Sequence, residues 1–184
     1  IGDRTTASHT CSFGSANNAY AFRLMKTLVR AKLNFISCPT ENIYLEGRQD
    51  SYPKRRGLTR VKELHDAGIN VCFAQDSISD PWYPLGNGNL MNILDHGIHI
   101  CQMMSFEEID HALDLITVNG ARTMHLLDQY GIEVGKPANF VVLDAPSPFE
   151  AIRQRAGILR SVRDGRELFV RIPSSLQSDV PLFA

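Results

Sequence analysis

The sequence predicts an α/β fold with a parallel sheet. Three short strand patterns are each followed by a helix pattern, which is the alternation that parallel sheets require. One of these strands, residues 70–74, is apolar at nearly every position, as expected for a strand buried on both faces of a parallel sheet. A doubly wound sheet and a (β/α)8 barrel share this signature. A barrel needs ~250 residues, so a chain of 184 residues could contain only part of one.

The first strand is expected over residues 4–9, a Thr-rich segment that ends at His9. A helix is expected over residues 16–32, because apolar side chains recur there at every fourth position. Residues 34–38 form the second strand pattern, which is short and apolar and stops at Pro39. We expect a loop rich in charged residues after this proline.

The third strand, residues 70–74, ends directly before Gln75 and Asp76. A helix over residues 59–67 precedes it, and Gly68 stands where a helix commonly ends. The segment DPWYPL, residues 80–85, contains two prolines and is expected to be a loop. Further helix patterns cover residues 89–103, 106–117 and 119–127.

The pattern of predicted elements changes near Gly131. From there on, short strand patterns are joined by glycine-containing turns. The Asp164-Gly165 pair lies between two such strands and is typical of a two-residue hairpin turn. We therefore divide the chain into residues 1–130, which carry the parallel sheet, and residues 131–184, which carry a second β-segment.

Charge and composition exclude several classes of protein. Lys and Arg number 19 and Asp and Glu number 20, so no basic excess attracts nucleic acid, and no nucleic-acid partner is expected. No apolar run approaches the ~20 residues of a membrane helix, and no signal peptide opens the sequence. The first residue is Ile1 rather than Met, so we expect a processed or truncated chain. The four cysteines form no C-x-x-C pair, which favours reduced thiols and a cytoplasmic protein.

Two polar residues stand where parallel folds place their chemistry, at the carboxyl ends of strands. His9 ends the first strand and Asp76 follows the third. An imidazole and a carboxylate at this edge could bind a metal or move protons. Alternatively, His9 is structural and Asp76 is a helix cap or a brace for its loop. Trp82, the one tryptophan, is either core filler or a rigid wall against a flat ligand.

Several longer segments are specific enough to compare with a known family. They are ASHT at 7–10, YPKRRGLTRVKEL at 52–64, GINVCFAQD at 68–76, DPWYPLGNGN at 80–89 and the closing stretch from 116 to 153. These segments resemble the bacterial cytosine deaminases of the amidohydrolase superfamily. The resemblance runs over nearly the whole chain, and the DPWYPLG block is its most specific part.

The resemblance implies a (β/α)8 barrel with a small β-sandwich, of which this chain would carry barrel strands 6–8 and the C-terminal part of the sandwich. It implies that Asp76 binds a divalent metal, iron or zinc, and handles the proton of the attacking water. His9 would orient that water, and Trp82 would line the pyrimidine pocket. The remaining metal ligands, an H-x-H and a histidine, would lie outside this chain. The chain alone is therefore expected to be inactive, and the full-length enzyme to be a homo-oligomer.

One departure from the family concerns the substrate, expected to be a small aminopyrimidine that is converted to the oxo-pyrimidine and ammonia. Cytosine deaminases generally carry a second aspartate directly after the metal-binding one, but here Ser77 follows Asp76. Serine is smaller and uncharged, so we expect a wider, less polar pocket that admits 5-methylcytosine. Two alternatives remain open: an amidohydrolase acting on another cyclic amidine or amide, and an inert chain.

Overall fold

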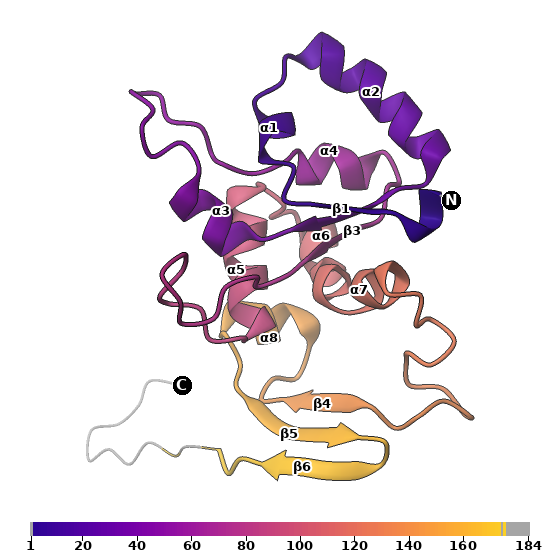
Figure 1. Cartoon of the computed structure of the whole chain (residues 1–184). Coiled ribbons are helices and arrows are strands. Elements are labelled where there is room, and N and C mark those ends of the chain that lie inside the picture. Colours follow the sequence, from indigo (N-terminus) through magenta and orange to yellow (C-terminus); the bar gives the residue numbers. More distant parts are fainter. Residues whose placement is uncertain (1, 174, 176–184) are drawn as a thin grey trace. The chain divides into compact units, whose positions relative to one another are not determined.

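The computed structural model describes residues 2–173 and residue 175 (Figure 1). The chain divides into two compact units, Ile1–Gly131 and Ile132–Ala184. The first unit contains a parallel sheet with its helices, and the described residues of the second form an antiparallel sheet with one helix. The expected α/β class is confirmed at this level.

The first unit is built on three parallel strands. They lie in the order β1 (Thr6–Ser8), β2 (Asn34–Ser37) and β3 (Val71–Phe73). Helix α2 (Asn18–Ala31) lies in the connection from β1 to β2, and α4 (Val61–Asp66) in the connection from β2 to β3. All three expected strands are confirmed, each shorter than the sequence pattern suggested. Because the strands are parallel, their carboxyl ends meet at one edge of the sheet (Figure 1).

The core of this unit centres on β3, all three residues of which are buried. Helix α5 (Leu90–Ile100) packs against β3 and buries Leu94 and Ile98 almost completely. Gly97 makes the close approach possible, because a Cβ atom there would lie 2.4 Å from the ring of Phe73. Each such buried aliphatic side chain contributes about 1.5–3 kcal/mol relative to an exposed one. This packing holds the segment that leads to Asp76.

The segment after β2 differs from expectation. The expected charged loop begins instead as a helix, α3 (Pro39–Leu45), with Pro39 in its first turn. Proline has no N–H to donate and a φ that suits a helix, so it is favoured at this position. The proline therefore ends the strand and begins the helix, and reading it only as a stop was wrong.

The later helices are also shorter and more divided than expected. The pattern over residues 106–117 forms α6 (Phe106–Asp110) and a separate 3₁₀ helix, η2 (Ala112–Ile116). Helix α7 (Val118–Thr123) ends before the expected residue 127. Two short elements were not expected: the 3₁₀ helix η1 (Gly2–Arg4) and α1 (Cys11–Gly14).

The second unit is a three-stranded antiparallel sheet in the order β4 (Phe140–Leu143), β5 (Ile158–Arg163) and β6 (Arg166–Val170). Asp164 and Gly165 both have positive φ, as a two-residue hairpin turn between β5 and β6 requires, so the expected hairpin is confirmed. Helix α8 (Pro148–Arg153), which the sequence pattern did not reveal, lies between β4 and β5.

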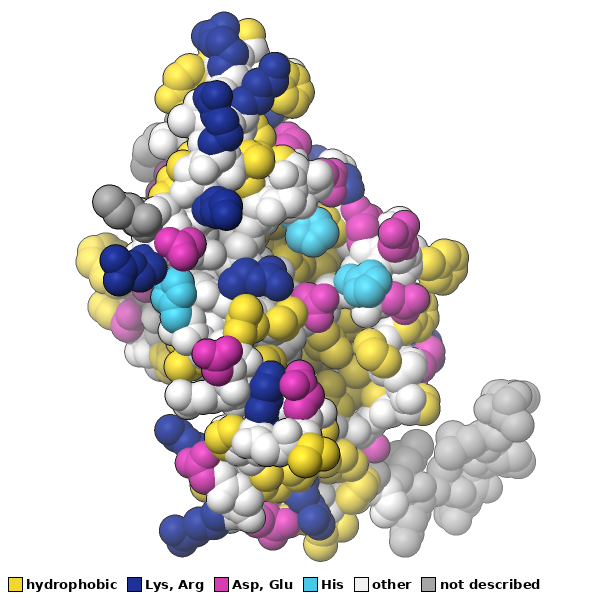
Figure 2. Space-filling view, turned by 90° about the vertical axis from the view of Figure 1, so that its right-hand side faces the viewer, with side chains coloured by type: hydrophobic (Ala, Val, Ile, Leu, Met, Phe, Trp, Pro, Cys, Tyr) yellow, Lys and Arg dark blue, Asp and Glu magenta, His cyan; other side chains and the backbone are white. Residues whose placement is uncertain are grey.

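The surface shown in Figure 2 carries basic and acidic side chains side by side over most of its extent. Basic side chains gather at the top of this view, the end at which Figure 1 draws α2. Among the helices of the described residues, none has both the length and the apolar character to cross a bilayer. All four cysteines are free thiols; Cys38 and Cys72 are buried, and the other two are partly buried.

Candidate active site

The carboxyl edge of the parallel sheet brings together two residues that are far apart in the sequence. His9 follows β1 and Asp76 lies three residues after the end of β3, so the two chain segments flank the central strand β2. Nε2 of His9 lies 3.3 Å from Oδ2 of Asp76. The side chains are 40% and 42% exposed, which leaves both accessible to a small molecule. The structure thus places the two expected catalytic residues as a contacting pair.

Both residues have unusual backbone conformations. The φ angle is 61° at His9 and 66° at Asp76, in the left-handed region that residues with a Cβ rarely adopt. Each such residue costs on the order of 1–3 kcal/mol, and such conformations cluster at functional sites. The backbone N–H of His9 donates to the carbonyl oxygen of Ile36 at 2.9 Å, which ties this strained residue to β2.

A hydrogen bond from α3 fixes the proton on the His9 ring. The side-chain nitrogen of Asn42 lies 2.9 Å from His9 Nδ1, and Asn42 Oδ1 accepts from the backbone N–H of Cys38 at 3.4 Å. An amide nitrogen can only donate, so Nδ1 accepts, and the neutral ring carries its proton on Nε2. That proton faces Asp76. His9 is therefore set up to donate a hydrogen bond from Nε2 rather than to bind a metal through it.

Three consecutive residues in the first turn of α3 hold both sides of the pair. Thr40, Glu41 and Asn42 are 2%, 5% and 3% exposed. Thr40 Oγ1 accepts from Gln75 Nε2 at 3.5 Å, and Glu41 Oε2 accepts from the backbone N–H of Ser77 at 3.1 Å. The residues on either side of Asp76 are thus anchored to the same turn that holds His9. Sequence reasoning missed this turn because it assigned the segment to a loop; Pro39 was the available signal.

Cys38 is the third group at this site that could bind a metal. The Cys38 Sγ atom and one ligand atom each from His9 and Asp76 all lie within 4.8 Å of one another. Burial, together with the nearby carboxylates of Asp76 and Glu41, raises the pKa of the Cys38 thiol to about 12. A protonated thiol is a poor metal ligand. The donor that best fits a metal in this arrangement is therefore the half-exposed carboxylate of Asp76.

Ser77 and Trp82 lie with the pair in one cleft. The cleft has a volume of about 490 Å³, and all four sequence-predicted site residues line it. Ser77 is 5% exposed, whereas Trp82 is 63% exposed. Asp80 Oδ1 accepts the backbone N–H groups of Trp82 and Tyr83 at 2.9 and 3.0 Å, which fixes the start of the tryptophan loop. Within this chain, Trp82 is therefore an exposed cleft residue and not part of the core of the described residues.

The charge of this cleft is one-sided. Four of its lining residues are acidic (Glu41, Glu46, Asp76 and Asp80), and neither Lys nor Arg is among the described residues that line it. Glu41 was not among the residues singled out from the sequence, and its carboxylate lies directly beside Ser77. Ser77 itself is uncharged, as the expectation of a less polar pocket requires, but Glu41 places a second carboxylate directly beside it.

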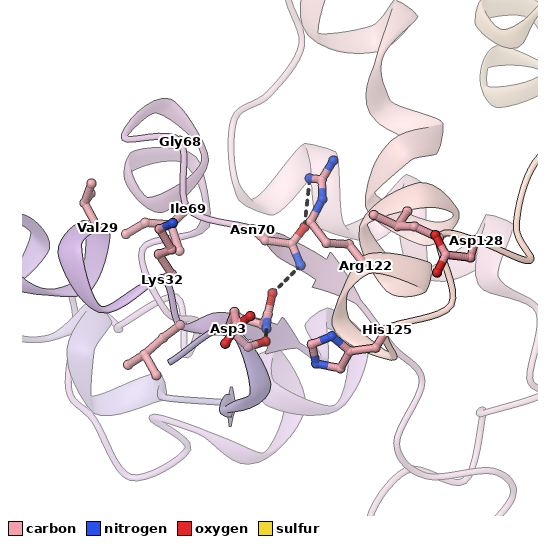
Figure 3. A pocket seen from close by; sticks show the side chains of 12 residues that line it. Asp3, Val29, Lys32, Gly68, Ile69, Asn70, Arg122, His125 and Asp128 are labelled. Carbon is pink, nitrogen blue, oxygen red and sulfur yellow. Dashed lines mark hydrogen bonds between the residues drawn. The ribbon is translucent and has the colours of Figure 1, made fainter. Parts of the chain in front are cut away.

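A larger cleft of about 580 Å³ lies away from these residues, around the amino ends of β2 and β3 (Figure 3). Its polar centre is Asn70, whose side-chain nitrogen donates to Asn34 Oδ1 at 2.8 Å and to Thr123 Oγ1 at 2.9 Å. Arg122 donates to Asn70 Oδ1 at 3.4 Å. These hydrogen bonds connect two strands to α7, so the polar residues of this cleft stabilise the fold.

The chain is similar to proteins of known family and structure. The profile described as "Amidohydrolase family" matches residues 1–169. A crystal structure of 5-methylcytosine deaminase from Klebsiella pneumoniae, liganded with 5-fluorocytosine, is similar to the chain with 53% identity and a TM-score of 0.94. The match covers 96% of this chain and 43% of that chain.

Two curated relatives are more distant. N-isopropylammelide isopropyl amidohydrolase of Pseudomonas sp. (strain ADP) is 29% identical, over 89% of this chain and 37% of that protein. Pterin deaminase of Rhizobium rhizogenes is 27% identical, over 90% of this chain and 40% of that protein. The chain therefore spans about two fifths of the length of the relatives that it matches.

Proposed function

Because the chain belongs to the amidohydrolase family, we propose that it forms the C-terminal part of a metal-dependent aminopyrimidine deaminase. The observation that carries the proposal is the His9–Asp76 pair, held in left-handed backbone at the carboxyl edge of a parallel sheet. The 53% identity to a 5-methylcytosine deaminase supports this substrate class. The proposed substrate is a cytosine ring, with or without a 5-methyl group.

In this proposal β1, β2 and β3 are strands 6, 7 and 8 of a (β/α)8 barrel, carried by residues 1–130. Residues 131–184 supply one sheet of a β-sandwich. The apolar side chains that β4 and β6 expose, including Val141, Leu168 and Phe169, support this role, because a second sheet would cover them. The remaining strands and metal ligands belong to a part of the enzyme that this chain does not include.

Asp76 would be the one metal ligand from this chain. A catalytic metal site normally takes three or more protein ligands, so the others come from the remainder of the enzyme. Iron and zinc both suit a site made of imidazole and carboxylate ligands. A bound divalent ion of this kind lowers the pKa of a coordinated water to about 7.

The reaction replaces the exocyclic amine of the ring by oxygen. Water adds to the ring carbon that bears the amine, the C–N bond breaks, and its electron pair leaves with the nitrogen. That nitrogen takes one of the two protons of the water and departs as ammonia, while the other proton ends on the ring nitrogen of the oxo product. Asp76 accepts a proton from the attacking water. The Nε2–H of His9 donates a hydrogen bond to the oxygen as charge develops on it. Trp82 forms a wall against the flat ring, and Ser77 leaves room for a 5-methyl group.

The balanced charge and the acidic cleft support a small-molecule substrate and no nucleic-acid partner. The four free thiols support a cytoplasmic location. A homo-oligomeric full-length enzyme completes the proposal, on the strength of the family resemblance.

The test is ammonia release by the full-length, metal-loaded enzyme. The enzyme is supplied in turn with 5-methylcytosine, cytosine, pterin and N-isopropylammelide. The last two rings appear in the names of the two curated relatives. Turnover of the cytosine rings with a higher kcat/KM than either other ring is expected. Preference for pterin or N-isopropylammelide would reassign the enzyme to another cyclic substrate. No ammonia from any ring in a metal-replete protein would contradict the proposal.

A further inference from the structure

Glu41 is a buried acid that the reaction outlined above does not use. It is 5% exposed and lies in the first turn of α3, yet it lines the same cleft as His9, Asp76 and Ser77. A buried carboxylate is costly unless hydrogen-bond donors satisfy both of its oxygens. Its contacts therefore indicate what the site is built to bind.

Only one of the two Glu41 oxygens is satisfied within the described part of the chain. Oε2 accepts from the backbone N–H of Ser77 at 3.1 Å, whereas no described residue donates to Oε1. Among the described residues, the one fully enclosed side-chain atom without a partner is Ser37 Oγ, so Glu41 Oε1 is not sealed inside the protein. Since Glu41 lines the cleft, this oxygen is open to a ligand there.

The position of Glu41 relative to the reacting centre follows from its neighbours. Ser77, whose N–H it binds, directly follows Asp76, and Asn42, the next residue after Glu41, holds His9. A ring whose amine-bearing carbon faces Asp76 and His9 therefore lies in the same cleft as Glu41, next to the residue that follows Asp76. An amine presents N–H donors, which a carboxylate oxygen can accept.

We propose that Glu41 is a specificity residue whose Oε1 accepts an N–H of the exocyclic amine, so that the cleft selects the amino ring over its oxo counterpart. This inference rests on the proposed deaminase function. The oxo product places an oxygen where the substrate has the amine, and two acceptors then face each other. Glu41 thereby favours binding of the substrate and release of the product.

The alternative is that Glu41 only braces Ser77. Glu41→Gln separates the two roles, because the amide oxygen can still accept from the Ser77 N–H while the amide nitrogen turns a donor toward the cleft. The measurements on the full-length enzyme are kcat/KM for 5-methylcytosine and Ki for its 4-oxo product. Glu107→Gln, on the exposed surface of α6, is the matched control for loss of one negative charge.

A specificity role predicts that Glu41→Gln lowers kcat/KM for 5-methylcytosine by about 10- to 100-fold, the range that a charge-assisted hydrogen bond supports. The same variant should bind the 4-oxo product as tightly as the wild type or more tightly, and Glu107→Gln should change neither value.

Three results would overturn the inference. Equal weakening of substrate and product would show that Glu41 is only a brace or that the variant is poorly folded, and thermal melting separates those two causes. Unchanged values for both ligands would remove Glu41 from the recognition site. An unmodified enzyme that releases no ammonia from any aminopyrimidine would overturn the proposed function itself, and this inference with it.

Discussion

The two ends of the parallel sheet are built on different principles. At the carboxyl end, His9 and Asp76 are charged or titratable, half exposed and held at positive φ. At the amino end, Asn34 and Asn70 are uncharged amides in ordinary backbone, with hydrogen bonds to each other and to α7. The first arrangement sacrifices stability for accessible polar groups, and the second provides stability. The difference supports the proposal that the carboxyl end carries the chemistry, although the larger cleft lies at the amino end.

Apart from loss of the Asp76 carboxylate, the largest effect is expected from His9 at the carboxyl end. In the full-length enzyme, His9→Ala should lower kcat by about 10²–10⁴-fold, the usual contribution of a positioned acid–base or hydrogen-bonding group. Metal content should be largely retained, because the His9 ring is positioned as a donor rather than as a ligand. Steady-state kinetics and elemental analysis on the same sample check this. His65→Ala, which alters an exposed histidine on α4, is the control and should leave both values unchanged. Loss of the metal in His9→Ala would make His9 a ligand.

A smaller effect concerns substrate size at Ser77. Ser77→Asp should shift the ratio of kcat/KM for 5-methylcytosine and cytosine toward cytosine by about ten-fold or more, because forcing a methyl group against an occupied wall costs about 1–3 kcal/mol. The ratio is measured for both substrates on both proteins. A ratio that does not move would place the Ser77 side chain away from the ring.

The amino end should respond in stability rather than in turnover. Asn70→Ala removes the donor to Asn34 and Thr123 and leaves their oxygens less satisfied, which should lower the free energy of unfolding by about 1–3 kcal/mol. The value is obtained from urea unfolding, and kcat is measured well below the unfolding transition. A fall in kcat comparable to that of His9→Ala would break the distinction between the two ends.

The positions of His9 and Asp76 at the carboxyl end could be predicted from the sequence. The apolar pattern of residues 70–74 fixes the position of Asp76, and the Thr-rich first strand fixes that of His9, because strand ends follow directly from local patterns. The turn that orients both residues was not predicted, because Pro39 both ends a strand and begins α3. Helix α8, which was also missed, likewise has a proline, Pro148, in its first turn. The role of Glu41 required the fold, since its partner Ser77 lies 36 positions away.

The smallest effect is expected far from the site, at the ion pair between Lys62 and Glu108. The hydrogen bond from Lys62 holds the pKa of Glu108 at about 2, below its ordinary value of 4.5. Because the folded state holds this pKa down, the pair stabilises the fold above about pH 4.5, and this contribution is lost as pH falls toward 2. Solvent screening limits it to about 1 kcal/mol or less. Urea unfolding at pH 5 and pH 3 should show a smaller loss for Lys62→Met than for the wild type. Equal losses would show that the pair is not formed in solution.

The most direct test of the account combines stability and activity at Asp76. Glycine adopts a φ of 66° without the cost that a Cβ imposes, so Asp76→Gly should raise the free energy of unfolding, by up to about 1 kcal/mol. The same variant of the full-length enzyme should lose its metal and release no ammonia from 5-methylcytosine. The predicted result is a variant that is more stable than the metal-free wild type and stays inactive when metal is supplied. Retained turnover in Asp76→Gly would contradict the assignment of the carboxyl edge as the active site.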